Sequence, residues 1–214
     1  MTALPDRPRL AFMASHNGSN MRAIVAACRD GTLSADPVLL VSNNRECGAM
    51  AWAADHGLTT AHLSAKVTGS EDALDVAIAE CLTAHRIDLV VLAGYMRKLG
   101  PRTIAGFPNR ILNVHPALLP KFGGRGMYGN FVHEAVLSAG DSVSGATIHI
   151  VDGEYDHGAI VAQAEVPVEA GDTPETLAAR VQAKERELFP ETLRQIVART
   201  IDLDTPAKRP SAPD

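Results

Sequence analysis

Short apolar, β-branched runs alternate with helical patterns along the first half of the chain. The runs that predict strands cover residues 9–15, 37–42, 59–63, 87–93 and 111–114. Between them lie a helix that ends near residue 29 and helices over residues 46–56, 71–85 and 102–105. In the helix over residues 71–85, Leu74, Ile78 and Leu82 share one face. The alternation predicts an α/β fold with a single Rossmann-like, doubly wound, mostly parallel sheet.

The pattern changes after Gly123, where the strands become closely spaced. A helix is predicted over residues 131–139, and strands follow over residues 146–151 and 160–166. The Asp/Gly-rich connection between these strands is too short for a crossover helix. We therefore expect an antiparallel C-terminal strand pair that extends the sheet.

A long C-terminal helix is predicted over residues 173–199. Thr173 is a suitable N-cap and Pro174 a suitable first helical residue. Pro190 lies inside this stretch, and we expect a break there because proline cannot donate its backbone hydrogen bond.

Length and composition fit one globular domain. The chain has 214 residues, of which 46% are hydrophobic and 21% charged. We place the domain at residues 9–200, with a flexible N-terminus over residues 1–8 and a disordered, Pro-rich tail over residues 201–214.

Charge and cysteine content indicate which classes of partner and which compartment to expect. The net charge is −5 with no basic stripe, so no nucleic acid partner is expected. Residues 1–9 contain no apolar signal segment, and the longest apolar run, residues 89–93, is too short to span a membrane. Three widely spaced cysteines, Cys28, Cys47 and Cys81, indicate idle thiols. We expect a cytoplasmic protein with no metal and no membrane partner.

The run at residues 111–120 ends in Asn113, His115 and Pro116. Side chains two apart on a strand point to the same face, so Asn113 and His115 project together at the carboxyl end, where open α/β sheets bind ligands. The amide can donate to a developing oxyanion, and the imidazole can carry a proton near neutral pH. Taken alone, such a pair is more often a strand end that satisfies loop backbone groups.

The first loop, residues 16–20, lies between a predicted strand and a helix. Backbone amides at a helix start, with Ser19 and Asn20, make an anion site suited to phosphate. The loop has one glycine and lacks Gly-Lys-Ser/Thr, so it is neither a dinucleotide fingerprint nor a Walker A loop. An N-capped turn that binds nothing is the alternative.

A third motif runs from Gly145 to Gly158. Thr147 and His149 share one strand face, and Asp156 in the following acidic loop could hold a histidine charged or correctly oriented. A turn aspartate and a hydrogen-bonded sheet histidine are the alternatives. Because H-E-x-x-H and G-x-S-x-G motifs are absent, the expected chemistry is proton transfer and electrostatic stabilisation.

These motifs, in this order, resemble the folate-dependent formyltransferase family over roughly residues 9–199. The matching segments are N-G-S-N at 17–20, S-N at 42–43, L-A-G-Y-M-R at 92–97, N-V-H-P-A-L-L-P at 113–120, G-x-T-x-H…Y-D-x-G at 145–158, and Arg180, Gln182 and Glu185. The resemblance makes residues 9–200 a formyltransferase domain. It implies formyl transfer from the co-substrate 10-formyltetrahydrofolate to the amine of glycinamide ribonucleotide in purine synthesis, without a covalent enzyme adduct.

The resemblance also implies roles for single residues. Asn113 would donate to the oxyanion, His115 would supply a proton, and Asp156 would favour the protonated imidazole. The residues expected to bind the ribonucleotide are Gly18, Ser19, Asn20 and Glu185. The residues expected to bind the folate are Met96, Arg97, Lys98, Leu99, Asn113, Asp152, Gly153, Glu154, Tyr155 and Asp156.

Three places depart from the family's usual pattern. His16 stands where many members have glycine, residues 69–72 are acidic where many have an arginine, and residues 121–129 form a basic, Gly-rich loop. Formyltetrahydrofolate deformylase, a hydrolase on the same scaffold, is the alternative function, and a non-catalytic binding module is another. The protein is expected to be a monomer or homodimer with small-molecule substrates.

Overall fold

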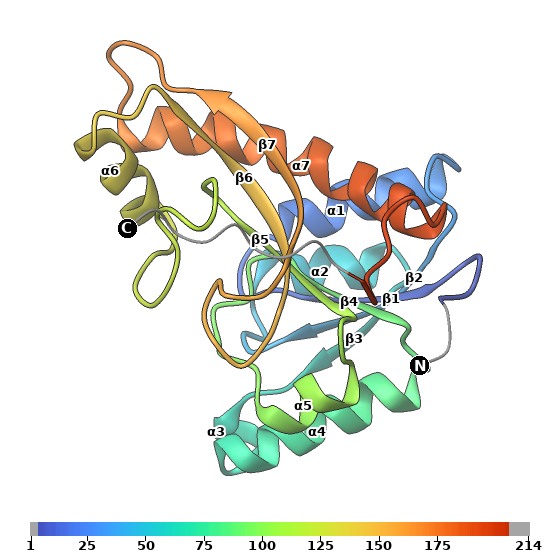
Figure 1. The fold of residues 1–214 in the computed structure, drawn as a ribbon. Coiled ribbons are helices and arrows are strands. Elements are labelled where there is room, and N and C mark those ends of the chain that lie inside the picture. The colour runs from blue at the N-terminus through green and yellow to red at the C-terminus, as the bar shows by residue number, and fades with distance from the viewer. Residues whose placement is uncertain (1–3, 206–214) are drawn as a thin grey trace.

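A seven-stranded sheet runs through the computed structural model, which describes residues 4–205 (Figure 1). The strands lie in the order β3-β2-β1-β4-β5-β6-β7. Their bounds are β1 Arg9–Met13, β2 Asp36–Ser42, β3 Thr59–His62, β4 Leu89–Leu92, β5 Ile111–His115, β6 Val143–Ile150 and β7 Ile160–Pro167. The first five strands pair in parallel, whereas β6 is antiparallel to both β5 and β7. The predicted α/β fold with an antiparallel C-terminal pair is confirmed.

Helices cover both faces of the sheet, as a doubly wound fold requires. The helices are α1 Ser19–Arg29, α2 Gly48–Asp55, α3 Ala65–Thr68, α4 Glu71–Ala84, α5 Pro101–Gly106, α6 Asn130–Ser138 and α7 Pro174–Val197. On β1, Leu10 and Phe12 join the core formed with α1, α2 and α7, whereas Ala11 and Met13 join the core formed with α4. The alternation of β1 therefore buries both of its faces. The short helix α3 was not predicted.

The long helix α7 begins as predicted but does not break. Thr173 caps it, and the side chains and amides of Thr173 and Thr176 bond reciprocally in a capping box. The helix continues through Pro190, so the predicted break is wrong. The hydrogen bond that Pro190 cannot donate would go to the carbonyl of Arg186, and Arg186 is exposed. Water can satisfy that carbonyl, while Phe189 and Leu193 hold the helix against the core.

Contacts at both ends of the described chain extend past the expected domain bounds. At the N-terminal side, Leu4 packs against the core, and Asp6 pairs with Arg199 at 3.0 Å. At the C-terminal side, Leu203 is buried and the carboxylate of Asp204 accepts two 2.9 Å hydrogen bonds from Arg110. These contacts attach the first part of the expected tail to the domain, whereas residues 206–214 lie outside the described residues.

The cysteines form no disulfide among the described residues. Cys28, Cys47 and Cys81 are free thiols, as predicted. Burial raises the pKa of Cys28 to about 11, which keeps that thiol protonated near neutral pH. Within residues 4–205, no helix has the length and apolar character needed to cross a membrane.

Candidate active site

Asn113 and His115 lie at the carboxyl end of β5, which pairs with β6. In the antiparallel register, Asn113 stands opposite His149 and His115 stands opposite Thr147. The Asn113 side-chain nitrogen is 3.1 Å from Nε2 of His149. Thr147 fixes the turn beyond the strand, because its hydroxyl donates to the Ala117 carbonyl at 2.6 Å. The predicted common projection of the pair is confirmed.

Both ring nitrogens of His115 have neighbours. Nε2 lies 2.7 Å from the backbone carbonyl of Phe122, and Nδ1 lies 3.3 Å from a carboxylate oxygen of Asp156. A carbonyl only accepts hydrogen bonds, so Nε2 carries a hydrogen. The side chain of His115 is only 3% exposed. The imidazole is therefore held in a fixed orientation inside the protein.

Asp156 lies between two imidazoles. One carboxylate oxygen is 3.5 Å from Nε2 of His149, and the other, beside His115, accepts a 3.0 Å hydrogen bond from the amide of Gly124. The Asp156 backbone adopts φ 52°, and its side chain is 11% exposed. The turn interpretation explains the backbone, but the carboxylate points inward and contacts the histidine pair.

Burial and charge act in opposite directions on this cluster. Burial lowers the pKa of His115, and the Asp156 carboxylate and the Phe122 carbonyl only partly oppose that shift. For Asp156, burial alone would raise the pKa, but contacts with His149, His115 and the Gly124 amide hold it below its ordinary value. Asp156 is therefore ionised near neutral pH and keeps negative charge beside His115.

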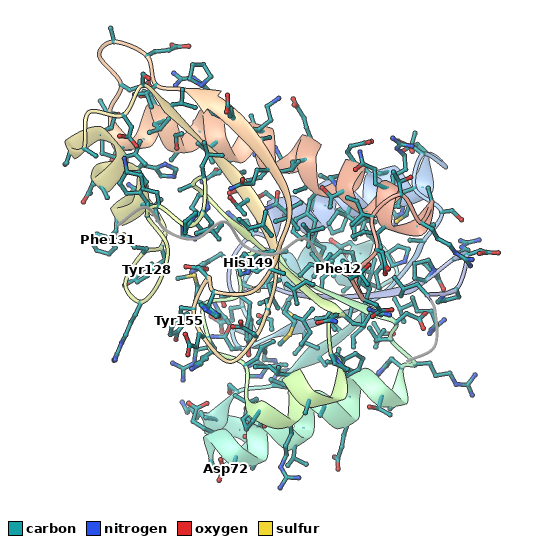
Figure 2. All side chains as sticks on the ribbon, in the orientation of Figure 1. Phe12, Asp72, Tyr128, Phe131, His149 and Tyr155 are labelled. Atoms are coloured by element: carbon teal, nitrogen blue, oxygen red, sulfur yellow. The ribbon has the colours of Figure 1, made fainter. Side chains whose placement is uncertain are left out.

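His149 is the neighbour that sequence reasoning undervalued. Its Nδ1 lies 3.0 Å from the Ile150 carbonyl, which can only accept, so Nδ1 donates, and Nε2 lies between the Asn113 amide nitrogen and the Asp156 carboxylate. Both nitrogens have partners, as expected of a sheet histidine, but the partners of Nε2 are Asn113 and Asp156 of the candidate site. Figure 2 labels His149 on β6. The sequence signal for His149 was the G-x-T-x-H motif of β6, which pairs with the N-x-H motif of β5.

The first loop and the C-terminal helix meet at a buried pair. Gly18 adopts φ 61° before α1, and Asn20 donates from its side chain to the Glu185 carboxylate of α7 at 2.9 Å. Burial raises the pKa of Glu185, with Asn20 opposing that shift. The side-chain oxygen of Asn20 is buried and has no hydrogen-bond partner within residues 4–205. The structure thus brings together two segments that are 165 residues apart.

An open cleft of about 560 Å³ lies beside the Asp156 loop. Its lining residues are Lys98, Gly124, Arg125, Glu154 and Tyr155. The Lys98 ammonium lies 5.5 Å from the centre of the Tyr155 ring, which Figure 2 labels on the loop after β6. Three of the residues expected to bind folate therefore surround one cavity, together with two residues of the loop at 121–129.

The other residues expected to bind folate have different surroundings. Met96 is exposed, and its amide donates to the Ser15 hydroxyl at 2.8 Å. Arg97 pairs with Glu71 at 3.1 Å, so the acidic departure from the family's pattern lies beside an arginine that is expected to bind the folate. Leu99 is buried in the hydrophobic core and does not line the cleft.

The acidic loop after β6 is partly held by its own contacts. Asp152 lies 2.9 Å from Nδ1 of His157 and accepts a 2.8 Å hydrogen bond from the amide of Glu154. Gly153 between them is exposed, with open space around its α-carbon. Of this loop, Glu154 and Tyr155 line the cleft and Asp156 contacts His115.

The chain belongs to the formyl transferase family, whose family model matches residues 8–193. It is 44% identical over 193 residues to phosphoribosylglycinamide formyltransferase, chloroplastic, of Arabidopsis thaliana, covering 90% of this chain and 66% of that protein. It is 35% identical to phosphoribosylglycinamide formyltransferase of Escherichia coli, covering 85% of this chain and 83% of that protein. The chain thus spans about two thirds of the plant relative's length.

Solved structures agree with this family. The structure of glycinamide ribonucleotide transformylase 1 from Symbiobacterium toebii is 36% identical, with a TM-score of 0.85, and covers 91% of this chain and 89% of that one. A formyltetrahydrofolate deformylase from Pseudomonas syringae has a TM-score of 0.80 but is 24% identical, with 90% of this chain and 62% of that one covered. The second likeness concerns the fold alone.

Proposed function

We propose that this protein transfers the formyl group of 10-formyltetrahydrofolate to the amine of glycinamide ribonucleotide, a step of purine biosynthesis. The observation that carries this proposal is the buried cluster of Asn113, His115 and Asp156 at the carboxyl end of β5. The family and the names of its relatives supply the reaction class.

The cluster has the groups that such a transfer needs. The substrate amine attacks the formyl carbon, a carbon–nitrogen bond forms, and the carbonyl oxygen gains negative charge. Asn113 has amide hydrogens for that oxygen. His115 supplies a proton to the folate nitrogen as its bond to the formyl carbon breaks, and the imidazole regains a proton from the amine nitrogen, which loses one on becoming the amide. The ionised Asp156 stabilises the imidazolium.

The start of α1 suits the ribonucleotide phosphate. The amides of the first helical turn, including Ser19 and Asn20, have no acceptor inside the helix, and no side chain within residues 4–205 caps them. Gly18 lets the chain approach at a left-handed φ of 61°. Glu185, held by Asn20, is proposed to lie near the glycinamide end of the same substrate.

The cleft is proposed to receive the folate. Lys98, Glu154 and Tyr155 line it, and Tyr155 presents an exposed aromatic surface. Met96, Arg97, Leu99, Asp152 and Gly153 flank these residues in sequence, and Asn113 and Asp156 lie at the reacting end.

The direct test combines purified protein, 10-formyltetrahydrofolate and glycinamide ribonucleotide and follows both tetrahydrofolate and the formylated ribonucleotide. We expect equal amounts of the two products, and little loss of formyl group when the ribonucleotide is omitted. The dephosphorylated substrate should react poorly, because it cannot use the α1 site. Equal deformylation with and without the ribonucleotide would overturn the transferase proposal in favour of the deformylase.

The proposal extends to location and assembly. Three free cysteines fit a reducing compartment such as the cytoplasm. The Arabidopsis relative is named as chloroplastic, so fractionation of the native host is the appropriate measurement. We propose a monomer or homodimer that binds 10-formyltetrahydrofolate and uses no metal, which sedimentation and metal analysis will check.

A further inference from the structure

One short segment contacts both members of the His115–Asp156 pair. The carbonyl of Phe122 lies 2.7 Å from Nε2 of His115, and the amide of Gly124 donates to Asp156 at 3.0 Å. The carboxylate oxygen that accepts this amide is the one that lies 3.3 Å from Nδ1 of His115. The two contacts therefore orient the imidazole and the carboxylate from one piece of backbone.

The backbone of this segment is unusual. Phe122 adopts φ 57° and Gly124 adopts φ 97°, and both values lie in the region that favours glycine. An ion pair outside the site holds the start of the segment, because Lys121 contacts both carboxylate oxygens of Asp141 at 2.6 and 2.7 Å. The Lys121 ammonium also lies 4.8 Å from the centre of the Phe122 ring. The segment is thus fixed at its surface end and contacts the site at its inner end.

The far end of the same loop is free of the site. Tyr128 and Phe131 meet edge to face with ring centres 5.4 Å apart, and both are exposed (Figure 2). Gly126, between the two ends, adopts φ 91°, and its amide has no hydrogen-bond acceptor among residues 4–205. Gly124 and Gly126 therefore share a backbone conformation but differ in their contact with Asp156.

The two contacts also determine which proton of His115 can move. The Phe122 carbonyl keeps a hydrogen on Nε2, so the neutral ring has its lone pair on Nδ1, facing the carboxylate. The second proton of the imidazolium is then the one on Nδ1. We propose that the backbone of Phe122–Gly124 positions the His115–Asp156 pair and assigns the transferable proton to Nδ1. This inference rests on the proposed role of His115 as proton donor.

Two other histidines lie near His115 and influence its protonation. His149 of β6 contacts the same carboxylate, and its charge would oppose protonation of His115. His133 of α6 is buried, and burial together with the charge of His115 lowers its pKa. Against these two histidines, the Asp156 carboxylate and the Phe122 carbonyl favour the imidazolium. A change that moves the Phe122 carbonyl or the Asp156 carboxylate away from His115 should therefore lower the pKa of His115.

The test compares Gly124→Ala with Gly126→Ala. A Cβ at either position meets nothing within 4 Å, so each change strains the backbone without a steric clash. Gly124→Ala should displace the segment, so that the Phe122 carbonyl moves away from His115 and the Gly124 amide from Asp156, and lower kcat by about tenfold or more, as expected when a charged group loses one hydrogen bond. In this variant, the decline of kcat at high pH should begin at a lower pH than in the wild-type protein. In Gly126→Ala, kcat should decline at the same pH as in the wild-type protein. Thermal unfolding will show whether both variants fold.

Nitrogen-15 NMR of the histidines supplies a readout that does not depend on turnover. In the wild-type protein, neutral His115 should carry its hydrogen on Nε2, and His115→Gln will assign the signal. Gly124→Ala should lower the pKa read from that signal. Gly124→Asn should restore part of kcat, because asparagine tolerates positive φ better than alanine. If Gly124→Ala fails to fold, the tautomer and Gly124→Asn still test the proposal.

The outcomes separate this inference from the proposed function. A neutral His115 with its hydrogen on Nδ1, or identical pH limbs for Gly124→Ala and Gly126→Ala, would overturn the inference while transferase activity stands. Absence of ribonucleotide-dependent transfer by the wild-type protein would overturn the proposed function, and the NMR titration would still report on the segment.

Discussion

The two ends of the candidate site differ in how completely their polar groups are satisfied. At the α1 end, first-turn amides are open and the side-chain oxygen of Asn20 is buried without a partner within residues 4–205. At the β5 end, both ring nitrogens of His115 have neighbours, and Asp156 contacts two imidazoles and one amide. The α1 end is therefore suited to bind a ligand, whereas the charged groups of the β5 end are already held in place before a substrate binds.

The largest effect is expected from His115→Ala, which alters the β5 end of the site. Removal of a positioned proton donor is expected to lower kcat by about 10²–10⁴-fold. The affinity for folate should change little, because His115 does not line the cleft. Steady-state kinetics and a folate-binding titration will measure both quantities. The control is His62→Ala on the edge strand β3, and near-normal turnover in folded His115→Ala would exclude His115 from the chemistry.

Asp156→Asn keeps the shape of the side chain but removes its charge. Turnover should fall less than in His115→Ala, because the proton donor remains. Since the Asp156 charge raises the pKa of His115, its loss lowers that pKa further. The rate, which needs the imidazolium, should then decline at lower pH than in the wild-type protein. An unmoved pH profile with an unchanged rate would leave Asp156 as a turn residue.

The α1 end of the candidate site is tested by Ser19→Ala combined with Asn20→Ala. Ser19 offers one hydroxyl to the phosphate, and Asn20 donates one hydrogen bond to Glu185, whereas the backbone amides remain in the variant. A hydrogen bond to a charged group contributes roughly 1.5–3 kcal/mol, so the KM of the ribonucleotide should rise by about tenfold or more. The KM of the folate should remain close to its wild-type value. The two constants are measured separately, and equal changes in both would mean that the variant has disturbed the whole site.

The smallest effect is expected from Glu71→Gln. The pair between Glu71 and Arg97 is largely exposed, and such pairs contribute about 0.2–1 kcal/mol. Its loss releases Arg97 for an anionic group of the folate, so the folate KM should fall by at most about fivefold. Glu191→Gln, which breaks the exposed pair with Arg194 on α7, is the matched control. A raised folate KM would show that Glu71 holds Arg97 in its binding position.

The features that can be predicted best from the sequence are those set by regular secondary structure. Asn113 and His115 were placed together because strand periodicity and a terminal proline define a face and an edge. The strand positions and the doubly wound fold follow from the alternation of apolar runs in the same way. Asp156 was singled out as a possible partner of a histidine, but its catalytic role came only from the resemblance, because a loop offers no periodic signal.

Contacts made by backbone groups in loops could not be predicted. The carbonyl of Phe122 and the amide of Gly124 have no side-chain signature, and their positions depend on distant packing and on the Lys121–Asp141 pair. The same applies to Pro190, where packing of neighbouring residues outweighs the local preference for a break. Long-range tertiary contacts, rather than local propensity, decided each of these features.

Helix α7 has a consequence for how the protein is made. It contacts α1, α6, β6 and β7, and it supplies Glu185 to the pair with Asn20. Because a growing polypeptide emerges from its amino end, Ser19 and Asn20 leave the ribosome long before their partner does. A nascent chain that ends before α7 lacks Glu185 and leaves apolar core surface uncovered. The Asn20–Glu185 pair, to which we assign ribonucleotide binding, therefore forms only after α7 has been synthesised.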